Sequence, residues 1–111
     1  MGFRSGTTDD NLLAALAQVE SACLVDALAT IPTKAAALQA AFPQRRVFGV
    51  AVAGVRTPTH SPRIHAMHGT GSVAEAAALV AAGPGARLVS IRQVIGGVTI
   101  ALAETDAGDS A

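Results

Sequence analysis

Residues 69–79, Gly-Thr-Gly-Ser-Val-Ala-Glu-Ala-Ala-Ala-Leu, join a glycine-rich turn to the start of a predicted helix. Ser72 is a favoured N-cap residue, and Glu75, three positions later, predicts a capping box. Alanines continue the helix to Ala82, and Gly83 ends it. Unpaired N–H groups and the positive end of the helix dipole meet where such a helix begins, and they favour a carboxylate or phosphate.

The other interpretation of this stretch is structural, namely a tight loop followed by a well-capped helix. A second glycine turn, residues 2–8, also leads into a predicted helix, with Thr7 or Thr8 as its cap. In an open α/β sheet such turns gather at one edge, where ligands usually bind. Both turns are therefore candidates for one binding site. The isolated cations Arg4 and Lys34 fit two interpretations, either facing the same edge as these turns or lying on solvated helix ends.

Helical and strand patterns alternate along the chain. The predicted helices cover residues 9–20, 34–41, 61–69 and 72–82, and the predicted strands cover residues 24–31, 46–52, 86–91 and 98–103. Gly96-Gly97 between the last two strands indicates an antiparallel hairpin. We expect an α/β protein: one three-layer α/β/α domain over residues 1–103, with a mixed sheet that ends in this hairpin, followed by a flexible tail over residues 104–111.

Composition narrows the classes of function. The chain has 111 residues and zero net charge, which fits one domain and argues against a general nucleic-acid or anionic-membrane surface. Cys23 is the single cysteine, so no internal disulfide forms. No segment approaches the roughly 18 uninterrupted apolar residues that a membrane span needs, and no leader pattern opens the chain. We expect a cytoplasmic protein.

Motifs for nucleophilic or metal chemistry are absent from the sequence. There is no Gly-x-Ser-x-Gly elbow, no His-Glu-x-x-His pair and no Walker loop. His60, His65 and His68 lack nearby Cys, Asp or Glu that would complete a ligand set, so we predict no metal site and no cofactor. Residues 57–63, with two prolines, three hydroxyls and an arginine, fit a polar pocket wall and a stiff surface linker equally well.

Four patterns in this order resemble the CobE/CbiG C-terminal domain family of cobalamin biosynthesis. They are Gly2-Phe3-Arg4-Ser5-Gly6-Thr7, Ala29-Thr30-Ile31-Pro32-Thr33-Lys34, the Thr-Pro-x-x-Ser-Pro-Arg connection at residues 57–63, and the stretch at residues 69–79 with the closing Gly97-Val98-Thr99-Ile100-Ala101. The resemblance covers residues 2–103. Family members usually begin with an apolar strand before the first glycine turn, whereas here Met1 alone precedes Gly2, and Ala37 stands where a glutamate is common.

The resemblance implies binding of a carboxylate-rich precorrin or corrinoid intermediate, in the aerobic pathway, with other cobalamin-pathway enzymes as possible partners. The expected substrate-binding residues are Gly2, Phe3, Arg4, Lys34, Gly69, Thr70, Gly71 and Ser72. No catalytic residue is assigned. One alternative is hydrolysis of the cobalt-precorrin-5A type, a lactone opening with loss of acetaldehyde in which Glu75 or a histidine activates water. The other is a non-enzymatic interaction domain outside the pathway.

Overall fold

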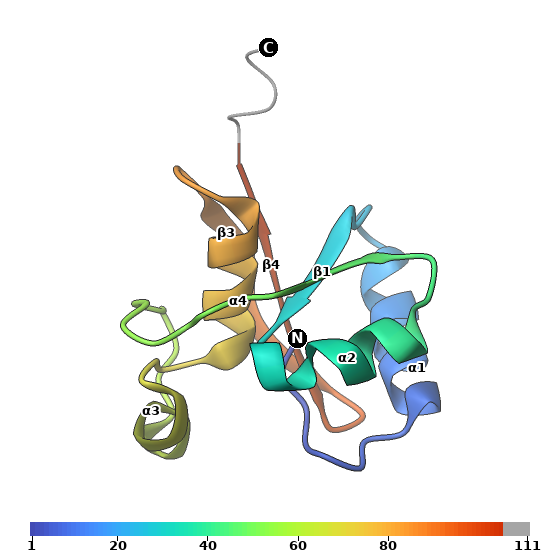
Figure 1. The fold of residues 1–111 in the computed structure, drawn as a ribbon. Coiled ribbons are helices and arrows are strands. Elements are labelled where there is room, and N and C mark those ends of the chain that lie inside the picture. The colour runs from blue at the N-terminus through green and yellow to red at the C-terminus, as the bar shows by residue number, and fades with distance from the viewer. Residues whose placement is uncertain (106–111) are drawn as a thin grey trace.

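The computed structural model describes residues 1–105, which contain both helices and strands (Figure 1). The elements are α1 (Asp9–Glu20), β1 (Ala27–Thr30), α2 (Pro32–Ala41), β2 (Arg46–Gly49), α3 (Pro62–His68), α4 (Val73–Ala82), β3 (Arg87–Ile95) and β4 (Val98–Glu104). The strands form a parallel pair, β1 with β2, and an antiparallel hairpin, β3 with β4. The expected α/β class and the closing hairpin are confirmed.

Residues 1 and 2 lie between the two pairs of strands. The Gly2 N–H donates to the carbonyl of Thr99 in β4 (2.8 Å), and the Thr99 N–H donates back to Gly2 (2.8 Å). On the other side, the Met1 amino group donates to the carbonyl of Ala29 in β1 (2.6 Å). This short segment therefore connects the parallel pair to the hairpin, and the four strands act as one mixed layer.

The alternation of side chains along the strands produces the two outer layers. Leu28 of β1 points into a core with α1 and α2, whereas the next residue, Ala29, points into a second core with α4. In Figure 1, α4 lies along β4 on one side, and α1 and α2 lie together on the other side of the domain. The three-layer α/β/α arrangement follows from this division.

Most element boundaries agree with the sequence to within two residues, and the three strands β1, β2 and β3 differ for reasons of pairing. β2 ends at Gly49 rather than at residue 52 because its last partner is Thr30, the end of β1. β1 begins at Ala27 rather than at residue 24 because its first partner is Arg46 of β2; Leu24, although apolar, is 94% exposed. β3 continues to Ile95 rather than ending at residue 91 because it pairs with Val98 across the Gly96-Gly97 turn. Glu104 lies in β4, and residues 106–111 of the expected tail lie outside the described residues.

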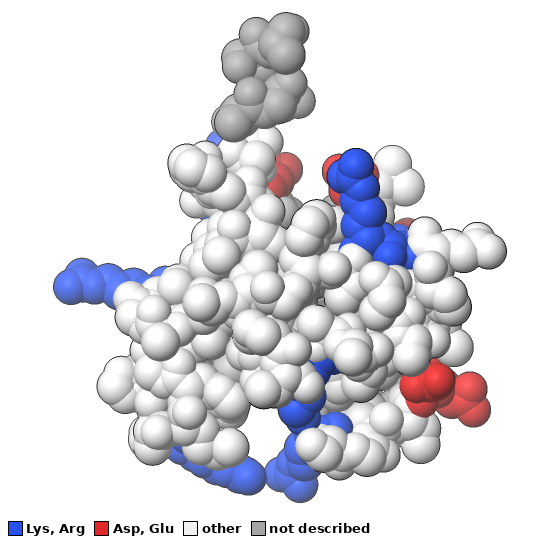
Figure 2. All heavy atoms as spheres, in the orientation of Figure 1, with Lys and Arg blue, Asp and Glu red and all other residues white. Residues whose placement is uncertain are grey.

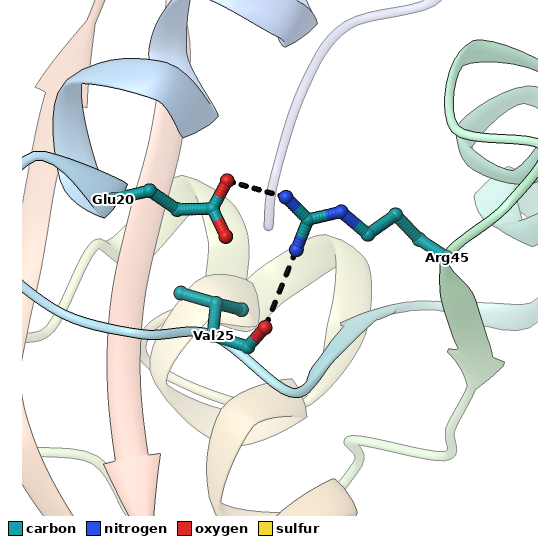
Figure 3. Close-up of polar contacts among 3 residues, drawn as sticks. All are labelled: Glu20, Val25 and Arg45. Atoms are coloured by element: carbon teal, nitrogen blue, oxygen red, sulfur yellow. Dashed lines mark hydrogen bonds and ion pairs between the residues drawn. The ribbon is translucent and has the colours of Figure 1, made fainter.

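An ion pair anchors the connection between α1 and β1 (Figure 3). Arg45 donates to the carboxylate of Glu20 and, through its other terminal nitrogen, to the carbonyl of Val25 (3.3 Å). The hydrogen bond to Glu20 raises the pKa of the Arg45 guanidinium above its ordinary value. Because the two side chains remain 32% and 27% exposed, water screens the pair, which contributes about 1 kcal/mol or less.

No helix within residues 1–105 is both long enough and apolar enough to cross a membrane.

Candidate functional site

A cavity of about 810 Å³ opens where the N-terminal segment, α3, the start of α4 and the β3–β4 turn meet. Its charged lining consists of Arg4, Lys34, Arg63 and Arg92, with His68 beside them. None of the acidic residues described by the structure lines it. In a chain with eight acidic and eight basic residues, this separation of charge gives the cavity a positive electrostatic potential. In Figure 2, Lys and Arg atoms border a hollow at the lower edge of the molecule.

The N-terminal segment forms one wall and is held by Lys34. The Lys34 ammonium donates to the carbonyl of Phe3 (2.6 Å) and lies 5.1 Å from the centre of the Phe3 ring, within the range of a cation–π contact. The Thr7 N–H donates to the carbonyl of Arg4 (3.1 Å), which closes the turn. Thr8 caps α1 by accepting from the Asn11 N–H (3.2 Å), so the segment is fixed at both ends.

The start of α4 forms the opposite wall. The Ser72 hydroxyl accepts from the Glu75 N–H (3.3 Å), which is the expected N-cap. Ser72, Val73 and Ala74 all line the cavity. Among residues 1–105, the amides of Val73 and Ala74 have no hydrogen-bond acceptor. The positive end of the helix therefore faces the cavity with free donors.

Thr30, the last residue of β1, also lines the cavity, although it is not among the binding residues expected from the sequence. Its side chain is 1% exposed, and its hydroxyl is the one buried side-chain polar atom of the described chain that has no hydrogen-bond partner. A buried polar group without a partner is costly, and such groups occur where a ligand or other function uses them. Thr30 is therefore a further candidate residue of the site.

Replacing Thr30 by Val tests this assignment. Val has nearly the same shape and removes only the unsatisfied hydroxyl, so the free energy of unfolding should rise by about 1 kcal/mol. Affinity for a polycarboxylate ligand should instead fall about tenfold, the equivalent of one lost hydrogen bond. Urea unfolding and ligand titration of the same preparation measure both. A loss of stability with unchanged affinity would give the hydroxyl a structural role.

Five of the eight expected binding residues line the cavity: Gly2, Phe3, Arg4, Lys34 and Ser72. The other three, Gly69, Thr70 and Gly71, do not line the cavity and lie against the connection between β2 and α3. Gly69, at φ +71°, caps α3 in the left-handed conformation that favours glycine. The Thr70 hydroxyl donates to the carbonyl of Val55 (2.6 Å), and the Gly71 carbonyl accepts from the Ser61 N–H (2.9 Å).

Gly71 shows why these residues are small. A Cβ atom at this position would lie 2.7 Å from the carbonyl oxygen of Thr59 and 2.8 Å from the hydroxyl of Thr57. Gly71→Ala should therefore lower the free energy of unfolding by about 1–3 kcal/mol, since a well-packed site gives way only by shifting backbone. Thermal unfolding measures the loss, and an unchanged Tm would contradict these contacts.

Glu75 departs from the expected capping box. Its carboxylate is fully buried and accepts from three donors far away in the sequence, the Thr59 N–H (3.1 Å), the Thr59 hydroxyl (2.7 Å) and the Arg92 N–H (2.9 Å), rather than reaching back to Ser72. It does not line the cavity. The spacing of Ser72 and Glu75 gave no sign of these partners, which lie in other elements.

The three histidines do not gather into a metal centre. His60 and His65 lie with ring centres 5.3 Å apart, and His68 lines the cavity. Over residues 1–105, no group of three or more His, Cys, Asp or Glu side chains is close enough to hold a metal ion.

Comparisons with known proteins agree with this architecture. The family model "Cobalamin synthesis G C-terminus" matches residues 1–103. The crystal structure of the cobalamin biosynthesis protein chiG from Agrobacterium tumefaciens strain C58 superposes with a TM-score of 0.68, at 35% identity over 94% of each chain. CobE, a protein from the cobalamin (vitamin B12) biosynthetic pathway, superposes with a TM-score of 0.73, at 30% identity over 92% of this chain and 84% of its own. No curated protein sequence matches the chain.

The fold and these similarities define the class: a small α/β protein of cobalamin biosynthesis. More narrowly, the chain belongs to the cobalamin synthesis G C-terminus family. The resemblance seen in the sequence is confirmed.

Proposed function

We propose that the cationic cavity binds a carboxylate-rich precorrin or corrinoid intermediate of cobalamin biosynthesis. The observation that carries the proposal is the lining itself, where four cations meet without an acidic side chain of the described residues. Relatives named for cobalamin biosynthesis support this class of ligand, because corrin precursors carry acetate and propionate arms around an apolar ring.

The cavity offers complementary groups for both parts of such a molecule. Carboxylate arms would meet guanidinium groups, the free amides at the start of α4 and the Thr30 hydroxyl; a charge-assisted contact is worth about 1.5–3 kcal/mol. The ring would lie against the apolar side chains Phe3, Ile64, Met67, Val73 and Val94. Clefts of roughly 300–1,000 Å³ are usual for small-molecule sites, and this one falls in that range.

A hydrolytic role for the same cavity has one supporting observation: His68 lines it and could act on a bound lactone. Glu75, the other candidate base, is enclosed by Thr59 and Arg92 and has no access to the cavity. Binding is therefore the function that the geometry supports best. Incubation with a lactone-bearing precorrin tests the hydrolytic role, since released acetaldehyde would show it.

Titration with hydrogenobyrinic acid, followed by visible absorption, tests the proposal. We expect a saturable spectral change with a Kd in the micromolar range, about −8 kcal/mol. The matched control is the fully esterified methyl ester of the same compound, which keeps the ring and loses the negative charges. Equal binding of acid and ester, or no saturable change with the acid, would refute recognition through carboxylates.

A further inference from the structure

We infer that Glu75 is a positioning residue for the cavity: its buried carboxylate holds two separate walls in the places from which Arg63 and Arg92 reach the ligand. The inference rests on the proposed function for what the cavity binds. It concerns a residue that makes no direct contact with a bound ligand, because Glu75 is fully buried and does not itself line the cavity.

The two oxygens of the carboxylate serve different elements. Oε1 accepts from the backbone N–H of Thr59 (3.1 Å) and from its hydroxyl (2.7 Å), and Oε2 accepts from the backbone N–H of Arg92 (2.9 Å). Thr59 lies in the connection before α3, and Arg92 lies in β3. One side chain on α4 thus ties together two segments that are distant in the sequence.

The first segment carries Arg63 to the cavity. Two residues after Thr59, the Ser61 N–H donates to the carbonyl of Gly71 (2.9 Å), and the Ser61 hydroxyl caps α3 by accepting from the Ile64 N–H (3.4 Å). Arg63 and Ile64, in the first turn of α3, line the cavity. The position of Thr59 on Glu75 therefore sets where this short helix begins.

The second segment carries Arg92 to the cavity from an irregular part of the hairpin. Ser90 pairs with Leu102 and Gln93 pairs with Ile100, so two residues of β3, Ile91 and Arg92, stand opposite one residue of β4. Two residues opposite one define a β-bulge, in which one backbone N–H loses its partner on the neighbouring strand and a side chain changes direction. Glu75 accepts that N–H, and the Arg92 side chain lines the cavity.

Only a carboxylate fits these three donors. A glutamine has the same shape but presents an NH₂ group in place of one oxygen, and this group would face the N–H of either Thr59 or Arg92. A fully buried charge is costly unless it is well hydrogen-bonded, and the positive end of α4 and the three donors supply that compensation. A requirement for three acceptor contacts thus accounts for an acidic residue in the interior.

The test compares Glu75→Gln with the wild type by amide hydrogen exchange and by titration with hydrogenobyrinic acid. In the variant we expect exchange at Thr59 or Arg92 to accelerate at least tenfold, while the amide of Leu16 in α1 keeps its rate. Affinity for hydrogenobyrinic acid should fall about tenfold. Unchanged exchange at both amides would overturn the inference.

A double-mutant cycle separates positioning from general destabilisation. If Glu75 acts through Arg92, the combined variant Glu75→Gln/Arg92→Gln should lose less affinity than the product of the two single losses. Fully multiplicative losses would overturn the inference. If Glu75→Gln does not fold, Thr59→Val replaces it, because that variant keeps the carboxylate and removes one of its donors. We then expect a smaller acceleration of amide exchange at residue 59. No acceleration there would refute the inference.

The experiment also keeps this inference apart from the proposed function. Hydrogen exchange requires no ligand, so it decides by itself whether Glu75 holds the two walls. A wild-type protein that fails to bind hydrogenobyrinic acid would refute the proposed function, whatever the exchange rates are.

Discussion

Replacing Arg63 and Arg92 together by Gln should weaken binding of hydrogenobyrinic acid by about 100-fold or more and leave the Tm unchanged. Both guanidinium groups line the cavity, and neither has a hydrogen bond or ion pair with a residue in the described part of the chain. Stability therefore loses little, whereas two charge-assisted contacts to carboxylates, each about 1.5–3 kcal/mol, are removed from the complex.

The matched control for this pair is Arg46→Gln/Arg56→Gln. It changes the net charge by the same amount at two exposed arginines that lie outside the cavity. Affinity should remain within about twofold of the wild type, since exposed charges that do not contact the ligand interact with it through water and are weakened by salt. Similar losses in both double variants would mean that overall charge, rather than this cavity, attracts the ligand.

The free energy of unfolding should rise between pH 5 and pH 8 in a chain that starts at Met1. The Met1 amino group is enclosed between β1 and β4, and burial lowers its pKa from 8.0 to about 5. Between these values the unfolded chain binds a proton that the folded chain does not, so stability increases with pH and is complete above pH 8. The difference of about 3 pKa units corresponds to roughly 4 kcal/mol, a large part of a typical domain stability.

Urea unfolding at intervals from pH 5 to pH 8 measures this dependence. The control is the same protein with a formyl group on the Met1 nitrogen, which removes the titrating amine. The formylated chain should show a flatter profile over this range, whatever its absolute stability, because the remaining groups are common to both forms. Parallel profiles would show that the amine titrates alike in the folded and unfolded chains.

Local signals in the sequence predicted the elements well. Apolar spacing and a threonine cap fixed α1 at its observed bounds, and Gly96-Gly97 placed the hairpin turn. The apolar run that begins at residue 24 predicted too long a strand, because the length of a strand depends on its partner and β2 offers only four residues for pairing. A local sequence pattern indicates the secondary structure that a segment favours, but it does not indicate the length of the strand with which the segment pairs.

The site was predictable only in part, for a physical reason. Arg4, Lys34 and Ser72 followed from helix starts and from the resemblance, and all three line the cavity. A glycine allows another group to pack close to the backbone, but the sequence does not show whether that group is a ligand or another part of the protein. At Gly71 it is the backbone of Thr59. Tertiary packing leaves the Thr30 hydroxyl without a hydrogen-bond partner and brings donors from other elements to Glu75. The spacing of residues in the sequence does not predict either arrangement.

The short segment formed by Met1 and Gly2 has a practical consequence for handling the protein. Ends of domains usually tolerate fusions, because they lie at the periphery and take part in few backbone hydrogen bonds. Here the first two residues join both halves of the sheet layer, so a purification tag attached directly to Met1 would have to emerge from the interior of the molecule. Attachment at the opposite terminus leaves this junction intact.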